Sequence, residues 1–123
     1  NEELKEMICR VNKLRSDNGK ELLLVDNRLM IAAQKHSEAQ ESNKKMSHKG
    51  FTKETEEFGD RFKLEGYAFT GAAENVAVGQ KSVKAVMKSW EDSPGHRNNI
   101  LGNYECFGYG KKKDYWTQAF ASG

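Results

Sequence analysis

Three side chains in the middle of the sequence have the chemistry of a metal or acid–base site. His48 lies in the segment MSH, Glu74 in AENVA and His96 in SPGHRNNIL. Two neutral imidazoles and one carboxylate form an open tetrahedral site for a divalent cation, with one position left for water or a ligand. No two of these residues are close enough in sequence to share a helical turn, so only the tertiary fold can bring them together.

Each of the three also has a purely structural interpretation. His48 can order a loop, His96 can pack at the start of a helix, and Glu74 can accept hydrogen bonds from backbone amides on an edge strand. Without a metal, the carboxylate can still hold the two imidazoles in fixed tautomers.

Length and composition limit the class of protein. The chain has 123 residues, which predicts a single domain over residues 1–123 with one core. No apolar run approaches the ~20 residues that cross a bilayer. The 20 basic residues nearly balance the 18 acidic ones, so we expect no nucleic-acid partner. The sequence begins at Asn1 without an apolar leader, which suits a mature or trimmed product.

Apolar residues recur at helical spacing in the first half of the chain. A first helix is predicted from Glu2 and ends by Gly19, a second spans about 26–43 with an aspartate N-cap, and a third spans about 52–66. His36 lies on the apolar stripe of the second helix, where we expect a hydrogen-bonded, half-buried packing residue.

The second half alternates strands and helices. Residues 72–78 predict a short strand with Glu74 on one face, and residues 83–90 predict a fourth helix. A short helix begins at Ser93-Pro94, with His96 in its first turn. Aromatic-rich segments predict a terminal hairpin. This order indicates an α/β fold: a three-layer α/β/α sandwich with a small, mainly antiparallel sheet flanked by helices.

Two other sets of residues are candidates for a role. Cys9 and Cys106 would close a long loop if the compartment is oxidising, but sequence cannot place them within bonding distance, so their pairing stays open. The candidates for lining an apolar lipid groove are Phe58, Phe62, Tyr67 and Phe69. The same residues could instead pack in the core.

The sequence segments themselves resemble a known family. The run from Ala32 to Gln40, the segments quoted above and the terminal YWTQAF are similar to the CAP superfamily, or SCP domain, which includes cysteine-rich secretory proteins, antigen 5 and pathogenesis-related proteins. The similarity covers nearly the whole chain in the right order. It is greatest to compact bacterial-type or minimal members, because cysteine-rich extensions are absent from this sequence.

The resemblance implies a fold, a location and a site. It implies an α/β/α sandwich, an extracellular or secreted protein, and a central cavity of two histidines and usually two acids that binds a divalent cation, often zinc. By matching segments, the metal ligands would be His48, Glu74 and His96. The second acid of larger members falls on Ser93 here, and the candidate for an additional acid is the neighbouring Glu91.

Two functions follow from these observations. The first is a secreted CAP binding protein with a His/Glu cavity for a divalent cation and a nearby apolar groove for sterol or another lipid; a protein partner is also compatible. The alternative is a metal- or histidine-assisted, peptidase-like hydrolase that uses Glu74 as a base. The chain has no HExxH or GxSxG motif, so an enzyme is the less favoured interpretation.

Overall fold

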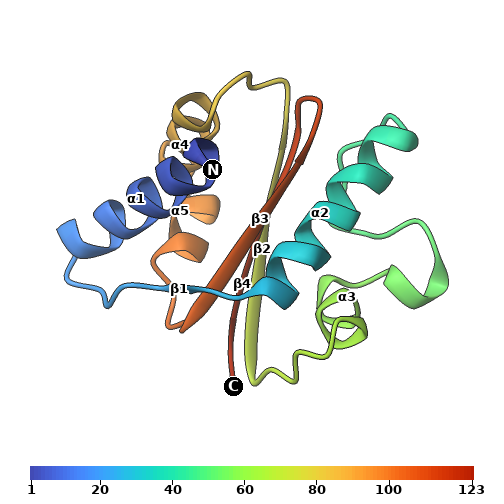
Figure 1. Ribbon diagram of the computed structural model, residues 1–123, viewed down its shortest axis with the longest axis horizontal. Coiled ribbons are helices and arrows are strands. Elements are labelled where there is room, and N and C mark those ends of the chain that lie inside the picture. The colour runs from blue at the N-terminus through green and yellow to red at the C-terminus, as the bar shows by residue number, and fades with distance from the viewer.

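The computed structural model describes residues 1–123 and places a twisted sheet between two groups of helices (Figure 1). The four strands lie in the order β1-β3-β4-β2, with β1 parallel to β3 and the other pairs antiparallel. Helices α1, α4 and α5 lie on one side of the sheet, and α2 and α3 lie on the other. The predicted α/β/α sandwich is therefore confirmed.

The helices are α1 (Glu2–Asp17), α2 (Asn27–Ser42), α3 (Phe58–Leu64), α4 (Val83–Glu91) and α5 (Pro94–Ile100), with a 3₁₀ turn η1 (Lys53–Thr55). The strands are β1 (Leu24–Val25), β2 (Gly71–Val78), β3 (Cys106–Lys112) and β4 (Tyr115–Ser122).

Capping residues fix the ends of the two long helices close to the predicted positions. Asp26 precedes α2, and its carboxylate accepts a hydrogen bond from the backbone N–H of Arg28. Asn1 does the same for α1 through Leu4 N–H. Each bond satisfies a donor that the helix itself leaves unpaired.

The third predicted helix is shorter than expected. Thr52 pairs with Thr55 in a local capping arrangement that ends after η1, and the extended Glu57 separates η1 from α3. The predicted continuous helix over 52–66 is therefore wrong, because these local hydrogen bonds compete with the helical ladder.

The sheet divides the apolar interior, so the single core expected from chain length consists of two clusters. The larger lies between the sheet and α1, α4 and α5 and contains both tryptophans, Trp90 and Trp116. The smaller lies under α2 and α3 and contains Leu29 and Phe62.

Strand β2 lies at one edge of the sheet, and its outward carbonyls are covered by side chains. Asn99 Nδ2 donates to the carbonyl of Glu74 at 3.3 Å, and Trp90 Nε1 donates to that of Val76 at 3.2 Å. These bonds block the edge against pairing with another strand. They also connect α4 and α5 to the strand that carries Glu74.

None of the helices combines the length and the apolar character needed to cross a lipid bilayer.

Candidate functional site

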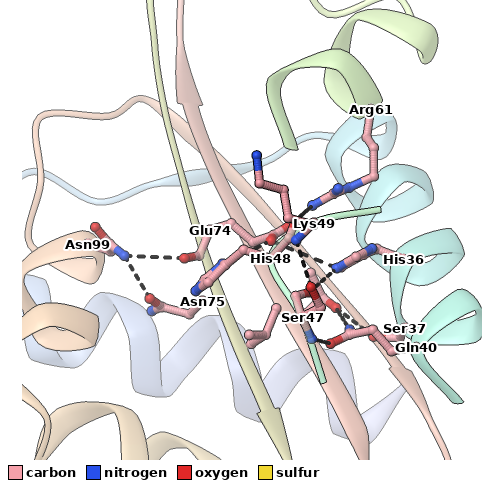
Figure 2. Close-up of polar contacts among 12 residues, drawn as sticks. His36, Ser37, Gln40, Ser47, His48, Lys49, Arg61, Glu74, Asn75 and Asn99 are labelled. Carbon is pink, nitrogen blue, oxygen red and sulfur yellow. Dashed lines mark hydrogen bonds and ion pairs between the residues drawn. The ribbon is translucent and has the colours of Figure 1, made fainter. Parts of the chain in front are cut away.

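A buried carboxylate organises the site. Glu74 is 3% exposed and lies on β2, with its side chain toward α2 and α3. Its Oε1 accepts a hydrogen bond from His48 Nδ1 at 3.2 Å, and its Oε2 accepts one from Arg61 Nη2 (Figure 2). The Nε2 of His36 lies 4.0 Å from the same Oε1. A buried charge needs such partners, and Arg61 supplies the opposite charge.

The loop that carries His48 is attached to α2 through Ser47, which uses both its backbone N–H and its backbone carbonyl. The Ser47 N–H donates to Gln40 Oε1 at 2.9 Å, and the Ser47 carbonyl accepts from His36 Nε2 at 2.6 Å. His36 and Gln40 are four residues apart, so they lie on the same face of α2. Helix α2 therefore sets the position of His48.

Strand β4 holds this face of α2 in turn. Thr117 is fully buried, and its hydroxyl bonds Ser37 Oγ at 2.8 Å and accepts from Gln40 Nε2 at 3.1 Å. The chain of contacts runs from Thr117 through Gln40 and Ser47 to His48. The threonine of the terminal YWTQAF segment is thus a positioning residue for the loop.

The next residue of β4 positions the other histidine from the opposite face of the sheet. Gln118 Oε1 accepts from Asn75 Nδ2 at 3.1 Å, and the same Asn75 amide donates to the backbone carbonyl of His96 at 3.2 Å. Asn99 Nδ2 donates to Asn75 Oδ1 at 2.9 Å. Adjacent strand residues point to opposite faces, so Thr117 and Gln118 support the two halves of the site separately.

The hydrogen bonds also define which imidazole nitrogens are free. A carboxylate only accepts, so the Nδ1 of His48 carries a proton and its Nε2 is the unprotonated nitrogen of the neutral ring. His96 Nδ1 lies 2.8 Å from Ser93 Oγ. When Nδ1 donates in that bond, Nε2 of His96 is likewise free to bind a ligand.

His96 lines a hollow beside β2, and the loop that carries His48 contributes Met46 to the same hollow. This hollow of about 230 Å³, which we name the edge hollow, is lined by His96, Ser93, Trp90 and Val78 and by Met46, two residues before His48. The pKa of His96 is lowered first by burial and then by repulsion from His48. The neutral form is the form that binds metals.

The predicted three-residue ligand set is not assembled. No group of three His, Cys, Asp or Glu side chains is close enough to hold an ion. Both Glu74 oxygens are engaged by His48 and Arg61, so the carboxylate orients His48 instead of facing the edge hollow. The candidate additional acid, Glu91, lies on α4 beside α1, where it lines a different depression with Arg10 and Lys13.

The proposed lipid-groove residues lie in or against the smaller core cluster. Phe62 and Tyr67 are 1% and 5% exposed, and the half-buried Phe58 and Phe69 pack against them. Their rings contact one another at centroid distances such as 5.8 Å for Phe58 and Phe62. These residues therefore pack in the interior, as the core-packing alternative predicted, and lipid binding at this place stays a prediction.

The two cysteines are free and lie on opposite sides of the sheet. Cys9 is exposed on α1, whereas the half-buried Cys106 on β3 packs against the cluster under α2. The Cys9–Cys106 disulfide is not formed, because the sheet separates the two side chains.

Two residues have roles at the site that the sequence alone does not reveal. His36 is 2% exposed, more deeply buried than expected, and it both fixes Ser47 and faces Glu74. Arg61 is 5% exposed and also donates to the His48 carbonyl at 3.0 Å. A histidine on an apolar stripe is a visible signal, but nothing local to Arg61 identifies its partner.

Stability is expected to fall below about pH 6.5, because His36 and His96 bind protons less readily in the folded chain than in the unfolded chain. Burial lowers the pKa of His36 from 6.5, although Glu74 opposes the shift, and burial also lowers the pKa of His96. Below pH 6.5 the unfolded chain then binds more protons than the folded chain, so the free energy of unfolding decreases as pH falls. The urea midpoints of unfolding at pH 7.5 and 5.5 measure this decrease. The His36→Gln variant should lose less stability between these two pH values than the parent does. Equal pH dependence of the two proteins would contradict the assignment to His36.

Comparison with known proteins gives one consistent family. Residues 9–120 match the CAP family, described as the cysteine-rich secretory protein family. The chain is 32% identical over 122 residues to the uncharacterized protein YkwD of Bacillus subtilis, covering 94% of this chain and 46% of that protein.

Solved structures agree with this result. A crystal structure of an extracellular protein containing an SCP domain from Bacillus anthracis superposes with a TM-score of 0.92 at 28% identity, over 97% of this chain and 40% of that one. An outer surface protein of Borrelia burgdorferi gives a TM-score of 0.85 at 20% identity, over 99% of this chain and 93% of that one. The latter identity supports the fold alone.

This chain spans less than half the length of YkwD and of the Bacillus anthracis protein. The matched region nevertheless includes His48, Glu74, His96 and the terminal YWTQAF segment. With its sandwich fold and this family match, the chain belongs to the CAP family, as an SCP domain.

Proposed function

We propose that this chain is an extracellular CAP binding domain that holds a divalent cation, zinc in the first place, between His48 and His96 at the edge hollow. Two imidazoles supply the protein ligands, and water or a bound molecule completes the shell. When bound, zinc would polarise an oxygen ligand at this edge. The chain's own contribution is to hold the two rings in the right tautomer and orientation.

The observation that carries this proposal is the hydrogen bond from His48 Nδ1 to the buried Glu74 carboxylate. A carboxylate behind a histidine fixes the tautomer and makes the opposite nitrogen a better metal ligand. Ser93 occupies the corresponding position behind His96. Side chains that orient both rings are what a two-histidine site needs, and a purely packing histidine does not need its outer nitrogen left free.

The extracellular assignment is supported by the relatives. The Bacillus anthracis protein is described as extracellular and the Borrelia protein as an outer surface protein. Free cysteines neither require nor oppose that location, because the fold does not depend on a disulfide.

The hydrolase alternative receives less support from the geometry. A general base must reach the proton that it removes. Glu74 is 3% exposed, and each of its oxygens is already bonded to His48 or Arg61. Glu74 therefore has no free oxygen directed at a water in the edge hollow, and we propose binding, not hydrolysis, as the activity.

Zinc titration calorimetry tests the proposal. We expect the parent to bind one zinc ion per chain, and His48→Ala and His96→Ala each to weaken binding at least about tenfold, because each removes a ligand. Ser93→Ala should weaken binding to a smaller degree, since it removes only the group behind His96.

Lys49→Ala is the matched control, because Lys49 is exposed and adjacent to His48 but donates no metal ligand. It should bind zinc as the parent does. Equal, weak binding by the parent and both histidine variants would show adventitious surface binding and refute the shared site.

A further inference from the structure

A second cavity is lined by His36 and Arg61, and the proposed function does not use it. We name it the α2 pocket: its volume is about 330 Å³, and it lies between α2 and the segment from Gly50 to Glu65. That volume lies within the range of small-molecule sites. Apolar surface comes from Ala32, Ala39 and Leu64.

The rim of the α2 pocket is bridged by an ion pair. Lys35 Nζ lies 2.8 Å from Glu65 Oε2, which joins α2 to the residue after α3. The pair balances charge at the mouth, so the entrance does not select strongly for anions or cations.

Two buried side chains that line this pocket each retain a polar atom without a partner: Nδ1 of His36 and Nε of Arg61. The rest of each side chain is engaged. His36 uses Nε2 on the Ser47 carbonyl, and Arg61 uses its terminal nitrogens on Glu74 and on the carbonyls of Thr55 and His48. A buried polar atom left unpaired costs about 1–3 kcal/mol.

His36 Nδ1 and Arg61 Nε can each be assigned as a hydrogen-bond donor or acceptor. A carbonyl only accepts, so His36 Nε2 carries the proton. Burial lowers the pKa of His36, which keeps the ring neutral and leaves Nδ1 as an acceptor. Arg61 Nε always carries a hydrogen and is a donor. The wall of the pocket therefore contains one unpaired acceptor and one unpaired donor.

We propose that the α2 pocket binds a small molecule with an apolar body and a hydroxyl group, and that the hydroxyl pairs with His36 and Arg61. A hydroxyl both donates and accepts, which matches the two atoms. A carboxylate matches less well, because the lone pair of neutral His36 repels it and Glu74 already balances the charge of Arg61. Both atoms are covered by neighbouring atoms, so the hydroxyl reaches them through a small outward shift of the pocket wall.

Three probes with the same ring separate the possible chemistries: benzyl alcohol, toluene and benzoate. Titration of the full chain is followed by two-dimensional ¹H–¹⁵N NMR. We expect benzyl alcohol to shift amides of α2 and residues 50–65, with a dissociation constant at least fivefold lower than that of either other probe. Equal binding of toluene would refute the hydroxyl assignment and indicate an apolar void. Tighter binding of benzoate would refute it and indicate an anion site. No response to benzyl alcohol would refute small-molecule binding in the α2 pocket.

Variants locate the binding. Ala39→Phe fills the pocket and should abolish the benzyl alcohol shifts, whereas Ala85→Phe, the same change at an exposed position of α4, should leave them intact. His36→Gln keeps a donor for Ser47 but has no acceptor at the position of the imidazole Nδ1, so we expect at least fivefold weaker benzyl alcohol binding. Unchanged affinity in both Ala39→Phe and His36→Gln would place the ligand elsewhere and refute the proposal. Zinc binding by Ala39→Phe should equal that of the parent, so this test and the zinc test can fail independently.

Discussion

Replacing Arg61 with methionine is expected to lower the free energy of unfolding by about 3–5 kcal/mol. The substitution keeps much of the side-chain volume but leaves the Glu74 carboxylate buried without an opposite charge. It also removes the donors to the carbonyls of Thr55 and His48, at 2.8 and 3.0 Å. Urea unfolding at pH 7.5 measures the change.

Two further variants make this prediction specific to the buried pair. Adding Glu74→Gln to Arg61→Met removes the stranded charge, so the double variant should be less destabilised than the sum of the two single variants. Lys35→Met breaks an ion pair in which the lysine side chain is 66% exposed, so it should cost at most about 1 kcal/mol. A loss below 1 kcal/mol for Arg61→Met would mean that the pair does not hold the site together.

Replacing Gly110 with alanine is expected to cost about 3 kcal/mol, because α2 lies directly against β3 at this glycine. A Cβ built on Gly110 would lie 2.3 Å from the backbone nitrogen of Gln34, and one on Gly108 would lie 2.4 Å from that of Met30. Backbone atoms cannot move aside like the end of a flexible side chain. The helix would therefore have to shift, and with it His36, Gln40 and the loop of His48.

Gly95→Ala is the matched control, since a Cβ there meets nothing within 4 Å. Its effect should lie within about 0.5 kcal/mol of zero. Urea unfolding of both variants measures the change in the free energy of unfolding. Equal stability of Gly110→Ala and Gly95→Ala would show that the approach of α2 to the sheet is looser than described. If the approach is tight, Gly110→Ala should also weaken zinc binding through the displaced loop.

Much of the fold could be predicted because its signals are local. The aspartate before α2 and the apolar face of α4 define these helices by capping and by spacing alone, and Val83, Val86, Met87 and Trp90 are all buried. Strand β1 could not be predicted, since two residues carry no pattern. The break before α3 was missed because Thr52 and Thr55 bond each other instead of continuing a helix.

The site was predictable only in part. The sequence segments identified Glu74 and both histidines, and the fold brings His48 into contact with Glu74. We expect Glu74 to orient His48 instead of serving as a ligand, because Arg61, on another element, occupies its second oxygen. No periodicity or motif relates Arg61 to β2, so a tertiary contact of this kind is visible only in three dimensions.

We propose that Glu74 orients His48 so that Nε2 of His48 and Nε2 of His96 bind the same ion. Long-range ¹H–¹⁵N NMR of the imidazole nitrogens, recorded with and without one equivalent of zinc at pH 7.5, tests it most directly. We expect a protonated Nδ1 in His48, and zinc-induced shifts of Nε2 in both His48 and His96 while the His36 nitrogens are unchanged. A His48 ring protonated at Nε2, or a zinc response confined to a single histidine, would contradict it.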